Sequence, residues 1–219
     1  MYKISTAFSL LLFGFTNILN AQKSISEATI QYDISIKPIQ SQAVANNLTG
    51  STFTIYLKGA FSRTDMVSNL GNEKTIHDGK NGTAVILKEY SGQKLMIAMN
   101  KEDWDNRVKK SSGITFINTN ESKVISGYNC IKATAKLNNG STVTVYYTKD
   151  IQTVNKEYST TFNNLPGLPV QYVFESTSMR FTYTLSKIDF NSILSAKFEL
   201  PKSGYRIMNY EEGKSEKKY

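Results

Sequence analysis

The sequence is poorest in the side chains that usually carry metal, redox and hydrolytic chemistry. Cysteine, histidine and tryptophan each occur only once in the 219 residues. Because Cys130 is alone, no disulfide can form within the chain, and cohesion has to come from packing and sheet hydrogen bonds. The paired spacing of cysteine and histidine ligands that zinc sites show is also missing. We therefore expect neither a disulfide framework nor a bound metal.

Nucleophilic catalysis has few candidates in this chain. A serine or cysteine nucleophile would have to use His77, which lies between Ile76 and Asp78 at a strand end beside a turn. That position favours a structural or solvent-facing histidine. Cys130 sits in an apolar strand pattern, which favours a buried structural thiol, because a reactive thiol needs a basic partner to lower its pKa.

The acidic residues and the glycines also favour structural roles over catalytic or phosphate-binding ones. Glu102, Asp103 and Asp105 cluster on a candidate helix, and paired carboxylates can cleave glycosidic bonds. The helix dipole explains Glu102 and Asp103 more simply, since acidic side chains stabilise a first turn. Gly79 and Gly82 lack the spacing and the following helix of a phosphate-binding loop. We expect no catalytic residue, no metal and no cofactor, and a hydrolase is the weakest functional hypothesis.

Long apolar runs are missing except at the start of the chain. Lys3 precedes an uncharged stretch over residues 4–19, and Asn20-Ala21-Gln22 ends it. This pattern is typical of a secretory signal peptide, which we predict over residues 1–21. The alternative is an uncleaved anchor, although a spanning helix needs roughly 20 mostly apolar residues. The sequence therefore predicts a periplasmic or secreted protein with no transmembrane segment after signal cleavage.

Basic residues outnumber acidic ones. The formal net charge is +8 for the whole chain. A basic exported protein can contact anionic lipid or lipopolysaccharide, although a well-solvated basic surface is the simpler interpretation of net charge. Nucleic acid is not an expected partner after export.

Alternation of apolar and polar side chains dominates the rest of the chain. From residue 30 to residue 36 the even positions are apolar and the odd positions are polar, the period-two pattern of a half-buried strand. Turn signals such as Ser91-Gly92 and Asn139-Gly140 separate similar stretches and indicate successive antiparallel hairpins. We predict a mainly β fold, a curved antiparallel sheet or half-barrel with one or two short helices, as a single domain over residues 22–208.

Three segments depart from this strand pattern. Residues 101–110 predict a helix that Asn100 caps and whose Trp104 packs onto the sheet. Residues 151–168 lack clean periodicity and are interpreted as a long loop with room for a short helix; long loops in compact domains are often functional. Residues 209–219 are charged and poor in apolar side chains, which predicts a disordered tail.

Several short motifs resemble secreted domain-of-unknown-function families of the Bacteroidetes, near the group named for its Gly-Leu-Pro-Gly-Leu-Ile motif. Asn164 and Pro169 replace the first Gly and the Ile of that motif, which favours a neighbouring family. The resemblance implies the architecture of the lipoprotein carriers LolA and LolB, a curved antiparallel sheet with a lipid-accepting concave face, and it carries over no catalytic residue. The matching residues are 125–133, 147–151, 165–169 and Gly204-Tyr205.

One predicted strand, residues 95–99, is apolar on both faces. One face is expected to meet the core, and the other either the helix that carries Trp104 or an apolar ligand. Combined with the resemblance, this predicts a non-enzymatic exported envelope protein whose curved sheet binds a lipid, an acyl chain or a lipidated envelope protein. The alternative is a surface or structural protein-interaction module that uses the basic face or residues 151–168. The candidate ligand-binding residues are Leu95, Met96, Ile97, Met99 and Trp104.

Overall fold

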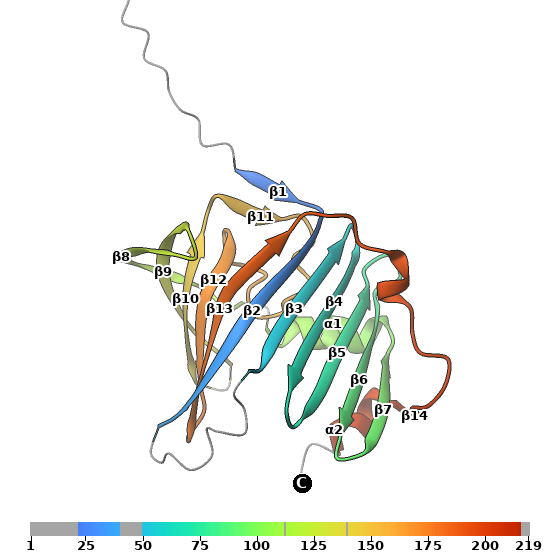
Figure 1. Cartoon of the computed structure of the whole chain (residues 1–219). Helices are drawn as coiled ribbons and strands as arrows, with labels where there is room; N and C mark the ends of the chain where they lie inside the picture. The colour runs from blue at the N-terminus through green and yellow to red at the C-terminus, as the bar shows by residue number, and fades with distance from the viewer. Residues whose placement is uncertain (1–21, 40–49, 112, 139, 216–219) are drawn as a thin grey trace, which may run out of the picture.

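One large sheet of twelve strands forms most of the described molecule (Figure 1). The computed structural model describes residues 22–39, 50–111, 113–138 and 140–215. The spatial order of the strands is β14-β7-β6-β5-β4-β3-β2-β13-β12-β10-β9-β8. Their bounds are β2 Glu27–Pro38, β3 Thr52–Lys58, β4 Phe61–Ser68, β5 Gly71–Asp78, β6 Thr83–Tyr90, β7 Gln93–Met99, β8 Ile117–Ile125, β9 Tyr128–Lys136, β10 Thr142–Thr148, β12 Leu168–Glu175, β13 Met179–Asp189 and β14 Arg206–Asn209.

Two antiparallel meanders make up this sheet, and β2 joins them. Strands β2 to β7 follow one another as hairpins, and β13 returns from the second meander to pair with β2 along most of its length. All neighbouring strands are antiparallel except β14, which lies parallel to β7. The predicted Ser91-Gly92 turn joins β6 to β7, and both of its residues have positive φ (51° and 76°), as a type I′ hairpin turn requires.

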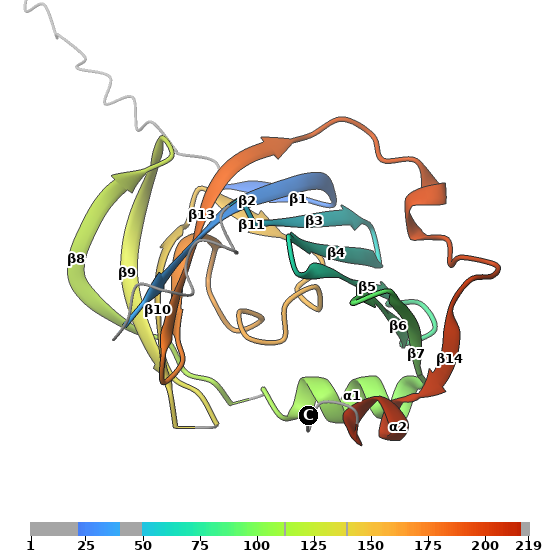
Figure 2. The ribbon, with the colours of Figure 1, turned by 60° about the horizontal axis from the view of Figure 1, so that its bottom comes forward.

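The sheet is strongly curved and does not close on itself (Figure 2). Residues 154–167 and the helix α1, Lys101–Lys109, lie within the curve, and we call the sheet surface toward them the inner face. The short helix η2, Ser195–Phe198, lies against the opposite, outer face, where it contacts β4. The predicted mainly β fold, a curved antiparallel sheet with short helices, is therefore confirmed.

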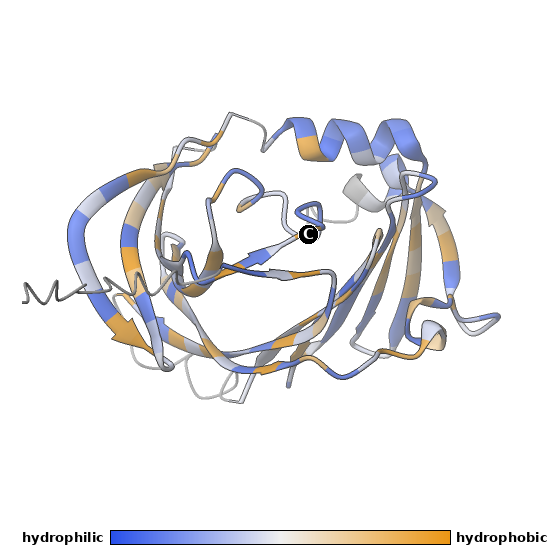
Figure 3. Cartoon of the chain, turned by 90° about the horizontal axis from the view of Figure 1, so that it is seen from above, coloured by the Kyte–Doolittle hydropathy of each residue, from blue (hydrophilic) through white to orange (hydrophobic). Residues whose placement is uncertain are grey.

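Alternating burial along the strands explains why this sequence forms the sheet. In β2, Ile30 and Tyr32 are at most 1% exposed and belong to the core, whereas Asp33 and Ser35 are exposed. Figure 3 shows the same alternation of hydrophilic and hydrophobic residues along the strands. Two apolar clusters result: a large one on the inner face of β2, β3, β9, β10, β12 and β13, and a smaller one beneath α1.

The predicted helix forms with the predicted cap. Asn100 accepts a hydrogen bond from the backbone of Asp103, whose side chain accepts one from the backbone of Asn100, so both halves of a capping box are present. Asp105 pairs with Lys101 at 2.6 Å. The three acidic residues of this helix therefore lie in its first turns, and two of them have structural partners.

Two segments differ from the expectations. The predicted loop over residues 151–168 begins with a short strand, β11, Ile151–Thr153, which pairs in parallel with β1, Lys23–Ile25. The tail predicted to be disordered from residue 209 instead begins with the last residue of β14 and continues as α2, Tyr210–Ser215, because Met208 and Gly213 pack against Ile97 and cover apolar surface of β7. The predicted signal peptide over residues 1–21 and the tail residues 216–219 lie outside the described residues.

None of the helices in the described part of the chain is long and apolar enough to cross a membrane.

Candidate binding face

The predicted ligand-binding residues split between the two faces of the sheet. Leu95, Ile97 and Met99 project from β7 onto the inner face, where they pack with Trp104 of α1 and are at most 6% exposed. Met96 points to the outer face and is half-buried. Four of the five residues are therefore together, but helix α1 covers them, so a ligand could contact them only if α1 moved away.

His77 extends this buried cluster toward the rim of the sheet. Its ring stacks on that of Trp104, with centroids 4.2 Å apart and planes 19° apart, and only 1% of the residue is exposed. Nε2 lies 3.4 Å from a carboxylate oxygen of Glu157, on the loop over residues 154–167. Neither ring nitrogen has a hydrogen-bond partner among the described residues. Burial lowers the pKa of His77, although the carboxylates of Glu157 and Asp78 oppose that change.

The main group of aromatic side chains lies on the other half of the inner face. Seven aromatic rings form a continuous network there, which we call the aromatic wall. Ring centroids of neighbouring members are 4.6 to 6.2 Å apart, within the range of favourable aromatic contacts. The members are Tyr32, Phe53, Phe116, Phe162, Tyr172, Phe174 and Tyr183.

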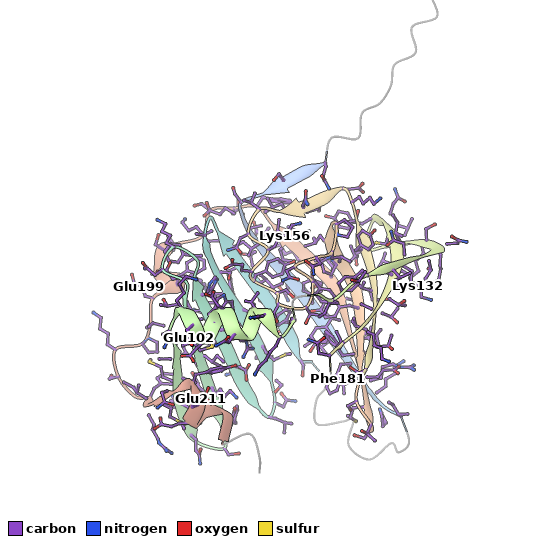
Figure 4. The ribbon with its side chains drawn as sticks, turned by 180° about the vertical axis from the view of Figure 1, so that it is seen from behind. Glu102, Lys132, Lys156, Phe181, Glu199 and Glu211 are labelled. Atoms are coloured by element: carbon purple, nitrogen blue, oxygen red, sulfur yellow. The ribbon has the colours of Figure 1, made fainter. Side chains whose placement is uncertain are left out.

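Only part of the aromatic wall is covered. Tyr32, Phe162 and Tyr172 are buried, whereas Phe53 and Tyr183 remain half-buried at its open side. Further half-buried apolar side chains continue that side: Phe174, Met66, Ile36 and Phe181, the last labelled at one end of the sheet in Figure 4.

Burial keeps the wall uncharged. It raises the pKa of Tyr183 to about 12, and it raises the pKa of Tyr172, with nearby Tyr32 and Tyr183 adding to that rise. Tyr32 donates its hydroxyl proton to the carbonyl oxygen of Pro169 at 2.7 Å. All three phenols are therefore neutral at physiological pH, and the wall presents apolar ring surface to whatever lies against it.

The loop over residues 154–167 packs on the inner face beside the aromatic wall. Phe162 and Leu165 are buried in the large apolar cluster, at 8% and 1% exposure. Asn155 donates to the carbonyls of the β3–β4 turn, and Asn164 donates to the carbonyl of Ile114 at 3.1 Å. At the end of the loop, a side chain on Gly167 would come within 2.0 Å of the carbonyl oxygen of Thr148, so only glycine fits there.

No shared catalytic arrangement links the histidine and the cysteine. Cys130 is 1% exposed on β9, its thiol donates to the carbonyl of Tyr128, and burial raises its pKa. Six strands separate β9 from β5, which carries His77. The predicted burial of Cys130 is confirmed, and among the described residues no group of three or more histidine, cysteine or acidic side chains could hold a metal ion.

Fold and site together define a class of protein: an open, curved antiparallel sheet with an aromatic inner face that its own loop partly fills. No protein-family model matches this chain, and no curated protein matches it in sequence. The resemblance to Bacteroidetes families therefore stays a prediction.

Solved structures share the fold. PNGF-II aligns with 88% of this chain at a TM-score of 0.53 and 15% identity, and the chain spans about a third (33%) of its length. An uncharacterised conserved protein from Thermus thermophilus aligns with 87% of this chain and 92% of its own, with a TM-score of 0.50 and 8% identity. The lipoprotein LppX of Mycobacterium tuberculosis gives a TM-score of 0.36 at 12% identity, over 74% of this chain and 88% of its own, too low to define a shared fold.

The aromatic wall was not among the predicted site residues. Tyr172 and Phe174 occupy alternate positions of β12, and Tyr183 belongs to the alternating pattern of β13, but such patterns also fit an ordinary half-buried strand. Only the pairing of β13 with β2 brings Tyr183 beside Phe53, across more than a hundred residues of sequence.

Proposed function

We propose that this protein is a non-enzymatic binding protein of the cell envelope that holds a lipid on the inner face of its sheet. The observation that carries the proposal is the aromatic wall, whose half-buried Phe53 and Tyr183 present neutral apolar surface inside a curved sheet. Export rests on the predicted signal peptide over residues 1–21. A protein that shields apolar groups in an aqueous compartment needs such an enclosed apolar surface.

The free energy of binding gives a lower limit for the size of the ligand. Each buried methylene contributes about 0.8 kcal/mol, and association costs at least about 4 kcal/mol in lost freedom of motion. A ligand retained with nanomolar affinity needs a net gain of about 12 kcal/mol. Roughly 20 methylene groups must therefore be buried, which points to a lipid with two acyl chains or a lipid-modified protein rather than a single short chain.

We infer that a ligand of that size extends beyond the half-buried side of the wall. The loop over residues 154–167 occupies the adjacent inner face, and its Phe162 already contacts Tyr172 at 4.8 Å between ring centroids. We infer that acyl chains replace Phe162 and Leu165 on the wall when this loop swings out. The hydrogen bonds of Asn155 and Asn164 hold the loop in its present position, so these two residues would lie at the hinges of that movement.

The test compares two aromatic residues of β3 that lie on opposite faces. We expect native mass spectrometry of the protein purified from a bacterial envelope to show a retained lipid. Phe53→Ala should lose most of it, because Phe53 belongs to the wall, whereas Tyr56→Ala should keep it, because Tyr56 lies on the outer face near Arg63 and Lys197. Tyr183→Ala should behave like Phe53→Ala.

A wild-type protein that is folded by circular dichroism yet carries no lipid would contradict the proposal. Equal loss from the Phe53 and Tyr56 variants would contradict the assigned face.

A second candidate function is protein interaction through β8, and one observation favours it. This edge strand is exposed along most of its length, with Ile117 67% and Val124 68% exposed, and none of the described strands pairs with its outer edge. Such an edge can accept a strand from a partner. The same native mass spectrum distinguishes the two functions, because a co-purified protein without lipid favours β8 over the aromatic wall.

A further inference from the structure

A hollow on the outer side of the sheet rim lies away from the aromatic wall. It has a volume of about 460 Å³, within the usual range for small-molecule sites. The end of β3, the β3–β4 turn and the helix η2 form its walls. Its lining includes Lys58, Phe61, Lys80, Ser195, Phe198 and Glu199.

Two aromatic rings give this rim hollow an apolar body. Phe61 of β4 and Phe198 of η2 lie with ring centroids 6.0 Å apart, and both are half-buried. The segment that carries Phe198 is held in place from both sides. Glu27 accepts from the backbone of Ile193 at 2.7 Å, and Arg63 donates to the carbonyl of Lys197 at 2.7 Å. The hollow is therefore a built part of the fold.

The two lysines at the rim hollow have different roles. Lys58 is already engaged, because its ammonium donates to Glu27 at 2.8 Å and to the carbonyl of Ile193. Lys80 is exposed, and its ammonium lies 5.6 Å from the centroid of the Phe61 ring. Within the described residues no carboxylate forms an ion pair with Lys80. The ammonium of Lys80, beside the ring of Phe61, is thus the charged group that is available to contact a ligand.

We propose that this rim hollow binds a small organic carboxylate with an apolar body, such as a medium-chain fatty acid. The apolar body lies against Phe61 and Phe198, and the carboxylate meets the ammonium of Lys80. Glu199 lines the same hollow and opposes an anion there. The site is independent of the lipid-binding function proposed above, since Phe61 and the aromatic wall lie on opposite faces of the sheet.

The experiment is a nuclear magnetic resonance titration of the protein with sodium octanoate. Saturable shifts are expected at the amides of Phe61, Ser195 and Phe198, which line only the rim hollow. Lys80→Ala should weaken binding about two- to fivefold and Glu199→Gln should strengthen it by a similar factor, the size expected for one exposed charge pair. Octan-1-ol should bind more weakly than octanoate, and Lys80→Ala should leave its binding unchanged.

Lys156→Ala is the matched control. It removes the same charge, but Lys156 lines a separate hollow, with Asn155 and Glu157, on the other side of the β3–β4 turn. Figure 4 shows Glu199 at one flank of the molecule and Lys156 nearer its middle. Octanoate affinity should be unchanged in this variant.

Three results would overturn the rim site. These are the absence of saturable shifts, equal weakening by Lys80→Ala and Lys156→Ala, or shifts centred on Phe53 and Tyr183. The last outcome would place octanoate on the aromatic wall. Loss of the retained lipid from the Phe53 variant tests only the proposed function, whereas the octanoate titration tests the rim site. A failure of one proposal can therefore be told apart from a failure of the other.

Discussion

At the scale of single residues, His77 is a buried titratable group whose two ring nitrogens both lack hydrogen-bond partners among the described residues. It is the only histidine of the chain and stacks on the only tryptophan, Trp104, in the cluster beneath α1. Two ring nitrogens buried without hydrogen-bond partners are costly, because they have lost their hydration. The facing carboxylate of Glu157 lies at 3.4 Å and is itself 58% exposed. We therefore expect the contact between His77 and the loop over residues 154–167 to make stability depend on pH.

The sign of that coupling follows from the lowered pKa of His77. An unfolded histidine takes up a proton near pH 6.5, whereas the folded one does so only at lower pH. The free energy of unfolding should therefore fall as the pH drops through about 6.5, by at most about 1.4 kcal/mol per pH unit, and level off below the folded pKa. Urea unfolding of the wild type and of His77→Phe, which keeps the stacked ring, measures this contribution.

Glu157→Gln provides the control for this pH effect. The Glu157 carboxylate raises the pKa of His77, so its loss should lower that pKa further and extend the decline to lower pH. If His77→Phe shows the same pH dependence between pH 7 and pH 5 as the wild type, the buried histidine is not its source.

At the scale of elements, one acidic side chain holds the start of the segment that carries η2. Glu27 of β2 accepts hydrogen bonds from Lys58, from the backbone of Ile193 and from Ser192. The hydrogen bond from Lys58, followed by that from Ile193, lowers the pKa of Glu27 to about 2. This contribution to stability is complete above pH 4.5 and is lost as the pH falls toward 2, because protonation removes the charge that attracts these donors.

Glu27→Ala should release this segment without unfolding the sheet. We expect hydrogen exchange at the amide of Ile193 to become about tenfold faster, since a charge-assisted acceptor is lost. Exchange in β2 and β13 should stay unchanged. Glu175→Ala, which removes the exposed ion pair with Arg180, is the matched control and should leave Ile193 unaffected. Unchanged exchange at Ile193 in the Glu27 variant would show that other contacts hold the segment.

At the scale of the whole molecule, the C-terminal residues complete the smaller apolar cluster. β14 pairs in parallel with β7, and Met208 lies opposite Ile97 at 4% exposure. α2 then packs Gly213 against Ile97, where even a methyl group would come within 2.8 Å of its side chain. Residues 206–213 therefore cover the edge of β7 that β6 leaves unpaired.

Neighbouring residues of β14 test this role. Met208→Ala should lower the free energy of unfolding by about 2–4 kcal/mol, because it removes a buried side chain and leaves a cavity. Ile207→Ala should change it by less than about 0.5 kcal/mol, because Ile207 is 74% exposed. Urea denaturation of both variants gives the comparison. Similar losses at the two positions would mean that β14 is not anchored by Met208.

Particular residues show how far the sequence predicts the fold and the site. The apolar positions from 30 to 36, the Asn100 cap and the Ser91-Gly92 turn act through near neighbours, and each was predicted. The helix that carries Trp104 was one of two predicted covers for the strand at residues 95–99, the other being an apolar ligand, and the structure has Trp104 packed there. The short helix α2 was missed because its six residues are charged or polar for the most part, and its stability comes from contact with β7 rather than from its own composition.

The sequence by itself determined the local properties: strand faces, turns, the capped helix, and the lack of a disulfide. Each depends on side chains within a few positions of one another, where periodicity and backbone preference act directly. Only the tertiary structure decided which surfaces meet, since pairing of β13 with β2 and the path of residues 154–167 bring together Tyr183, Phe53 and Phe162. Burial is a property of the assembled sheet, and an alternating strand has the same pattern whether its apolar face is filled by the chain or left for a ligand.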